Sequence, residues 1–301
     1  MVQNNMSTTK LNENIKEIIK EDINITSIWH IISFFGTYLL SYLVPAIIFF
    51  LYMIFIFVPN VLQTDNIIIL FTQLIPLISF LLIPVVLISC YLLHLFFLAL
   101  VIRWLFRSTE KKIPSKDGII PRNIPSKTLD FYHIRSFMLK YPKYAFTKGM
   151  FPWLSNWAFN FIGSTNIGKG TIIEEQVCGD KYIDVGKNCY IGPNSILASH
   201  MVDGIYGNIS YFKIKIGDNV TFTGQNAIAP GTEINDNSYL LPMASASKFN
   251  VLKGNNYYYG IPLRKIFKSK IQEYLQITKD ELNMDQSLRE KQSRHKKNNT
   301  E

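Results

Sequence analysis

Apolar residues recur at every sixth position through the second half of this chain of 301 residues. The positions in register are Phe161, Ile167, Ile173, Val185, Ile191 and Leu197, then, after an interval, Ile216, Phe222, Ile228, Ile234 and Leu240. Only Gly179 departs from the first group. Small or β-branched residues repeat four positions later, at Thr165, Thr171, Val177, Cys189, Ser195, Val220, Thr232 and Ser238. This hexapeptide repeat predicts a parallel β-helix.

Each hexad is expected to form one short strand and one turn. Its apolar residue points into a triangular prism, and its small residue occupies the narrow corner. Pairs such as Asp218–Asn219 suit turns in which φ is positive. Three hexads complete a coil, and coils contact only their neighbours. A β-sandwich is the alternative, but it would alternate at a period of two. We therefore expect an all-β domain over residues 161–266, with coils to about Ser247 and a closing segment.

The first half of the chain contains two long runs without any Asp, Glu, Lys or Arg, at residues 28–58 and 66–102. Each run exceeds the ~20 residues that cross a bilayer. Residues 28–102 are therefore predicted to form a transmembrane α-helical hairpin. Two alternatives stay open. The runs could be buried core helices, or the second could be two short re-entrant segments broken near Pro84.

The distribution of charge predicts an orientation for this hairpin. The formal net charge is +9, and the connection at residues 59–65 has one acid and no Lys or Arg. Basic residues follow the second run at Arg103, Arg107, Lys111, Lys112, Lys116 and Arg122. By the positive-inside rule, both termini are cytoplasmic and the protein is integral to the cytoplasmic (inner) membrane. The lipid bilayer, with its anionic headgroups, is the expected partner, and no nucleic-acid motif accompanies the charge.

Three further segments complete the organisation. Residues 1–27 form a polar cytoplasmic segment with a short amphipathic helix at 11–23. Residues 103–160 form a basic and aromatic linker and cap. Its aromatic residues suit either a belt at the membrane interface or a cap on the open end of the prism, since a first coil must be covered. Residues 267–301 form a C-terminal helix at 267–289 and a basic tail. The three cysteines, Cys90, Cys178 and Cys189, form no CxxC pair and are interpreted as structural.

The end of the repeat carries a family resemblance. Residues 260–266 read Gly-Ile-Pro-Leu-Arg-Lys-Ile and resemble the usual ending of hexapeptide-repeat acyltransferases, Gly-x-Pro-Ala-Lys/Arg-x-Ile, with Leu263 in place of Ala. The resemblance implies a left-handed β-helix, a homotrimer, and acyl-CoA as a co-substrate rather than a permanently bound cofactor. It also implies that the donor lies along the prism and is held partly by Arg264 and Lys265.

The order of segments resembles one repeated unit of the C-terminal membrane part of ε-poly-lysine-synthetase-type (Pls) peptide synthetases. The closest local match is Ser-His-Met-Val-Asp-Gly at residues 199–204. This resemblance implies a variant in which the donor is an aminoacyl thioester on a carrier protein, and a possible peptide-synthetase partner.

The candidate chemistry centres on His200, which is the only histidine between Phe161 and Leu240. Leu197 and Ile216 are nineteen residues apart, one more than three hexads, so a loop is expected to leave the coil beside His200. In the family, a neutral histidine takes a proton from the acceptor, and Asp203 or a carboxylate of a neighbouring subunit would orient it. The alternatives are an ordinary surface histidine, and His133 or His94 as weaker candidates.

A metal site is not expected. Gamma-type carbonic anhydrases share the prism but need three histidines on Zn²⁺, and this segment supplies one. The sequence thus predicts a membrane-anchored acyltransferase that moves an acyl or aminoacyl group from a thioester donor to an amine or hydroxyl. The alternative is a non-catalytic trimeric membrane scaffold built on the β-helix. The acceptor, the acyl group and the choice between CoA and a carrier protein are left open.

Overall fold

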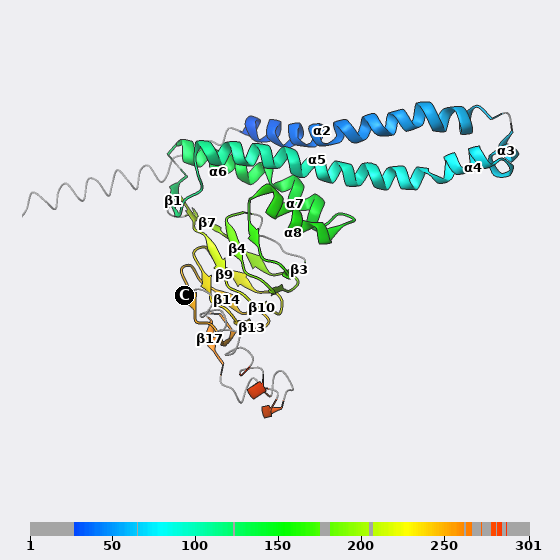
Figure 1. The fold of residues 1–301 in the computed structure, drawn as a ribbon. Helices are drawn as coiled ribbons and strands as arrows, with labels where there is room; N and C mark the ends of the chain where they lie inside the picture. The colour runs from blue at the N-terminus through cyan, green and yellow to red at the C-terminus, as the bar shows by residue number, and fades with distance from the viewer. Residues whose placement is uncertain are drawn as a thin grey trace, which may run out of the picture. The chain divides into compact units, whose positions relative to one another are not determined.

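The computed structural model describes residues 27–64, 66–122, 124–174, 181–204, 207–261, 263–266, 272, 278–280, 282–284 and 287 (Figure 1). They fall into two compact units. The helical unit comprises Ile25–Ile113 and Phe131–Ile162, and the β unit comprises Pro114–Asp130 and Gly163–Glu301. The helix expected at 11–23 and most of the one expected at 267–289 lie outside the described residues.

Two long helices lie side by side in the helical unit (Figure 1). Helix α2 (Ser27–Tyr52) continues as the π-helix η1 (Met53–Leu62), and α5 (Ile83–Lys112) returns beside it. The helices are antiparallel, because the Cys90 thiol lies 3.6 Å from the Pro45 carbonyl while the ring of His94 stacks on Tyr42 at 3.7 Å.

The second apolar run is not one continuous helix. It forms α3 (Ile67–Thr72), α4 (Leu74–Leu81) and α5, with breaks at Gln73 and Leu82. Pro84 lies in the first turn of α5, where a missing N–H removes no helical hydrogen bond. Pro84 therefore marks the start of α5, and the alternative of two re-entrant segments stays a prediction.

The surface of these helices is apolar. Large side chains such as Phe35, Leu39 and Phe50 are more than half exposed, at 56%, 65% and 63%. Two helices, Ile31–Leu62 and Leu74–Lys112, are long and apolar enough to cross a membrane. The polar side chains inside the pair, Thr37, Ser41 and Ser79, donate to carbonyls of their own helix turns. These three hydroxyls are thus satisfied within their own helices, whose outer surface is hydrocarbon.

The segment 103–160 is more ordered than the predicted linker. It contains the end of α5, strand β1 (Gly118–Pro121), α6 (Lys127–Met138), α7 (Lys140–Thr147), the 3-10 turn η2 (Pro152–Leu154) and the start of α8 (Ser155–Ile162). Phe151 and Leu154 pack against the buried cluster formed by α5, α7 and α8, within the helical unit. Phe151 and Leu154 thus contribute to a helical core, whereas Trp153 and Trp157 are exposed, and the cap on the prism stays a prediction.

Phe161 is a correction to the predicted register, because it lies in α8 and not on a coil. Its neighbours Ala158, Phe159 and Ile162 are buried on one side of that helix. Their spacing is that of a helical face, which overlaps the period of six by chance at this position.

Three sheets form a parallel β-helix in the β unit. The short strands of the coils are β2 (Asn166–Ile167), β3 (Ile172–Ile173), β4 (Ile183–Val185), β5 (Tyr190–Ile191), β6 (Ile196–Leu197), β9 (Ile214–Ile216), β10 (Thr221–Phe222), β11 (Ala227–Ile228), β12 (Glu233–Ile234), β13 (Tyr239–Leu240), β14 (Ser245–Ala246), β15 (Val251–Leu252) and β16 (Tyr257–Tyr259). Successive strands visit the sheets in turn. Thr221 pairs with Tyr239, and Ile234 with Leu252, eighteen residues apart. A coil is therefore three hexads long.

The interior of the prism follows the predicted register. Ile191, Phe222 and Leu240 are fully buried in one hydrophobic cluster. The corner residues Ser195 and Thr232 are fully buried as well. After Leu240 the register continues through Ala246 and then, past Ser247, through Leu252 and Tyr258, which belong to the same cluster. The expected end of the coils near Ser247 is therefore wrong, because small and aromatic residues occupy the inward positions of the last coil.

The turns explain the Asn and Gly residues of the repeat. Asn194, Asn219 and Asn237 have positive φ, as the sequence predicted. Met243 and Phe249 adopt the same conformation, although bulky residues seldom do. At Gly186, a Cβ would collide with the backbone of Gly217 in the next coil. Glycine after an inward residue thus allows two coils to approach each other.

Candidate functional site

The β-helix is interrupted once, between β6 and β9. Tyr190 pairs with Thr221 across thirty-one residues instead of eighteen, so thirteen residues leave the coil. They form the antiparallel hairpin of β7 (His200–Asp203) and β8 (Asn208–Tyr211), to which β1 adds a third strand. We call β1, β7 and β8 the flap. The sheet order β1-β8-β7 makes β7 its outer strand.

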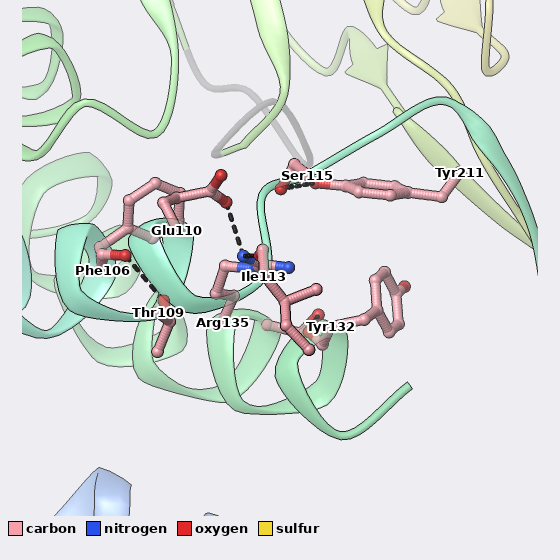
Figure 2. A network of polar contacts seen from close by, with 9 residues as sticks. Phe106, Thr109, Glu110, Ile113, Ser115, Tyr132, Arg135 and Tyr211 are labelled. Carbon is pink, nitrogen blue, oxygen red and sulfur yellow. Dashed lines mark hydrogen bonds and ion pairs between the residues drawn. The ribbon is translucent and has the colours of Figure 1, made fainter. Parts of the chain in front are cut away.

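Aromatic and apolar contacts hold the flap within the β unit. Ile120 of β1 and Ile209 of β8 pair across the sheet and are both buried. The ring of Tyr211 stacks on that of Tyr182 at 4.8 Å, and its hydroxyl donates to the Ser115 hydroxyl at 3.3 Å (Figure 2). The flap is therefore a packed element rather than a loose loop.

A polar cluster fastens the flap to the coil end at β14. The ammonium of Lys248 donates to both carboxylate oxygens of Asp203 at 2.8 Å and to the Ser210 hydroxyl at 2.9 Å. Ser210 in turn donates to Asp203 at 2.7 Å. The hydrogen bonds from Lys248 and Ser210 hold the pKa of Asp203 below its usual range. Asp203 therefore keeps its charge at neutral pH, and the cluster would loosen only when acid protonates it.

A cavity of about 700 Å³ lies between the flap and the sheet β14-β11-β6. Its walls are mainly hydrocarbon, from Ile196, Ala198, Met201, Ala227, Ala229, Ser245, Ser247 and Ile261, with Asp203 and Lys248 beside them. Its size is that of a small-molecule site. Sequence reasoning missed Lys248 and the cavity, because neither belongs to the period of six.

His200 begins β7, opposite Tyr211 on β8, and is half-buried. Side chains alternate along a strand, so His200 and Val202 face one side while Met201 and Asp203 face the other. Met201 and Asp203 line the cavity. His200 is therefore the neighbour in sequence of the cavity-lining Met201, but its side chain lies on the opposite face of the flap, on the edge strand β7.

The predicted orienting role of Asp203 toward His200 stays a prediction, and the contacts described above for Asp203 are with other residues. The Asp203 carboxylate is bound by Lys248 and Ser210, and the alternation of β7 separates it from His200. Arg264 and Lys265, the predicted donor-binding residues, form the exposed strand β17 (Arg264–Lys265), which pairs with β16 after the last coil. Ile261 of the cavity lies three residues before Arg264.

The helical unit has polar clusters of its own. Arg135 is buried, and it donates to the Ile113 carbonyl at 2.7 Å and pairs with Glu110 at 2.8 Å (Figure 2). His94 is also buried, with its Nε2 2.9 Å from the Tyr141 hydroxyl. Burial raises the pKa of Tyr141. Both clusters join elements to α5, which is a structural role.

Among the described residues, no group of three His, Cys, Asp or Glu side chains could hold a metal ion. Cys90 and Cys189 are free thiols, and burial raises the pKa of Cys189. Cys178 lies outside the described residues.

Among known proteins, similarity is found to solved structures only. No family model matches the chain, and no curated protein matches it. A hexapeptide-repeat-containing acetyltransferase from Vibrio cholerae is similar, with 23% identity over 36% of this chain and 64% of its own, and a TM-score of 0.32. This chain thus covers less than two thirds of that protein.

Two further solved structures have the same character. A maltose O-acetyltransferase from Clostridium difficile 630 has 17% identity over 56% of this chain and 87% of its own, with a TM-score of 0.31. A galactoside acetyltransferase in complex with coenzyme A has 18% identity over 56% of this chain and 81% of its own, with a TM-score of 0.30. Scores of this size do not decide what this chain does.

Proposed function

We propose that this protein is a membrane-anchored acyltransferase that moves an acyl group from a thioester donor to an amine or hydroxyl. One observation carries the proposal. A regular hexapeptide β-helix is broken at a single place among the described residues, by a packed flap that bears His200 at its open edge and covers an apolar cavity. An extruded loop that brings a histidine to the prism is also what the family resemblance implies.

The proposed reaction needs one base and no redox partner. The acceptor oxygen or nitrogen attacks the thioester carbonyl, and His200 takes the proton that the acceptor loses. The tetrahedral intermediate collapses, the carbon–sulfur bond breaks, and the thiolate leaves and takes a proton from the imidazolium. Free thiol and acylated acceptor are the products, and His200 is neutral again.

The other proposed residues act on position. Asp203 and Lys248 hold the flap at its place over the coils. In this proposal Asp203 holds the flap and does not orient His200. A carboxylate from a neighbouring subunit would then orient the imidazole. Arg264 and Lys265 are exposed cations beyond the last coil and are proposed to bind the phosphates of the donor. The left-handed winding and the trimer stay predictions from the resemblance.

A membrane location is supported by the surface of α2, η1 and α5. Water would hydrate a long band of exposed Leu, Ile and Phe side chains there at a large cost, whereas hydrocarbon would not. Lipid also demands that backbone groups be paired internally, which these helices achieve. We propose that both termini and the β unit face the cytoplasm, where acyl-CoA and carrier proteins are found.

This topology can be tested with an impermeant thiol reagent on intact cells. Gln63→Cys, in the connection between the two runs, should be labelled, whereas Lys112→Cys should be labelled only after the cells are opened. The native chain gives the background of its own cysteines. Labelling of Lys112→Cys alone in intact cells would reverse the orientation.

Donor binding distinguishes the enzyme from a non-catalytic scaffold. The full chain in lipid nanodiscs should bind coenzyme A, and Lys265→Gln should weaken that binding several-fold because a phosphate contact is lost. Lys169→Gln is the matched control, since Lys169 is an exposed cation near the opposite end of the coils. Native mass spectrometry of the same sample should give three chains. A sample that binds neither coenzyme A nor an acyl-carrier thioester would favour the scaffold.

A further inference from the structure

We propose that the cavity under the flap holds the acyl chain of the donor, and that this chain is a linear one of medium length rather than acetyl. The inference rests on the proposed function and deepens it by naming the substrate class. It starts from the size of the cavity, about 700 Å³, which is far more than an acetyl group occupies.

The floor of the cavity differs from the other two faces of the prism. Ala227 pairs with Ile196 and Ser245, so their outward side chains stack in a row across three coils. Ala198, Ala229 and Ser247 are the outward residues two positions further on. Equivalent positions carry Asp184, Lys215 and Glu233 on one other face, and Tyr190, Thr221 and Tyr239 on the third. In this first row, the face under the flap is thus the one without a charged or aromatic side chain among the described strands.

These two rows run along the prism axis, and we call the part of the cavity above them the trough. Coils are spaced by ~4.8 Å, so a row over three coils is ~10 Å long before the end walls are counted. Met201 covers it from the flap, and Ile261 lies on its lining beyond the last coil. A straight hydrocarbon chain suits this shape better than a ring or a branched group does.

Charge favours the same ligand. The two ionised side chains on the lining, Asp203 and Lys248, bind each other and leave no net charge for a carboxylate or an amine to pair with. An uncharged chain that enters from the edge of β7 would leave its thioester at that edge. His200 borders the same edge on the other face, so the chain and the base would flank one carbonyl.

The experiment measures binding of acyl donors to the full chain in nanodiscs, because detergent would compete for an apolar cavity. Acetyl and octanoyl thioesters of coenzyme A are compared with those of pantetheine, the arm that carrier proteins share. Empty nanodiscs correct for partition into lipid. Since each buried methylene strengthens binding about fourfold, octanoyl donors should bind at least tenfold more tightly than acetyl donors.

Ala229→Phe fills the trough from its floor and should abolish the preference for octanoyl over acetyl donors. Thr221→Phe, an outward change on another face of the same coil, is the control. Ala227→Leu makes the same test with a smaller change if Ala229→Phe does not fold. Equal affinities for the two acyl groups, or a preference that survives in both trough variants, would overturn this inference and leave the acyltransferase standing. Failure of every thioester to bind would overturn both.

Discussion

His200→Ala is expected to lower acyl transfer by about 10²- to 10⁴-fold, the usual contribution of a positioned general base. The fold should persist, because His200 is half-buried on the outer strand of the flap, outside the prism core. Coenzyme A binding should change little, since the donor is proposed to be held elsewhere. The native rate should depend on pH through this base, and that dependence should disappear in the variant.

His133→Ala is the matched control, because it removes a histidine of the helical unit whose ring contacts Tyr132 in α6. Its activity should equal that of the native chain. Full activity in His200→Ala would show that His200 is not the general base.

Ile191→Asp is expected to destabilise the β unit by several kcal/mol, a large part of the ~5–15 kcal/mol that stabilises a typical domain. Ile191 is fully buried, and its stacking partners in the neighbouring coils are Ile173 and Phe222. A carboxylate there would lose its hydration and find only hydrocarbon. Unfolding of the full chain, followed by the circular dichroism of its strands, should show the transition at a markedly lower temperature.

Ile172→Asp makes the same chemical change one residue before Ile173, where the side chain is 59% exposed. It should shift the unfolding free energy by less than about 0.5 kcal/mol. Similar losses in both variants would show that the inward and outward positions of the strands have been exchanged.

The coil interior was predictable from the sequence, because every coil repeats one geometry. In every coil the inward position must be apolar and the corner must be small. The prism therefore produces a period of six in the sequence. Val185, Phe222 and Ile234 follow that rule and are buried. The pattern misleads where a helical period coincides with the period of six. Phe161 fits the period of six, but it lies in α8, whose buried residues have helical spacing.

The last coil shows a second limit of the pattern. Ala246 and Tyr258 occupy inward positions, but neither is a typical core residue of this repeat. The prism tolerates a small and a large side chain there because adjacent layers share one continuous interior. The sequence alone gives no measure of that shared volume.

The candidate site divides in the same way. The sequence located His200 and a loop beside it, since a lone histidine and a broken period are both local signals. The tertiary structure decided the partner of Asp203, which is Lys248, forty-five residues away, brought near by a coil fold with a thirteen-residue excursion. It also decided the cavity, whose floor unites alanines and serines from three coils. The repeat does not restrict the residue type at outward positions. Only the stacking of the coils therefore shows which outward side chains line the cavity.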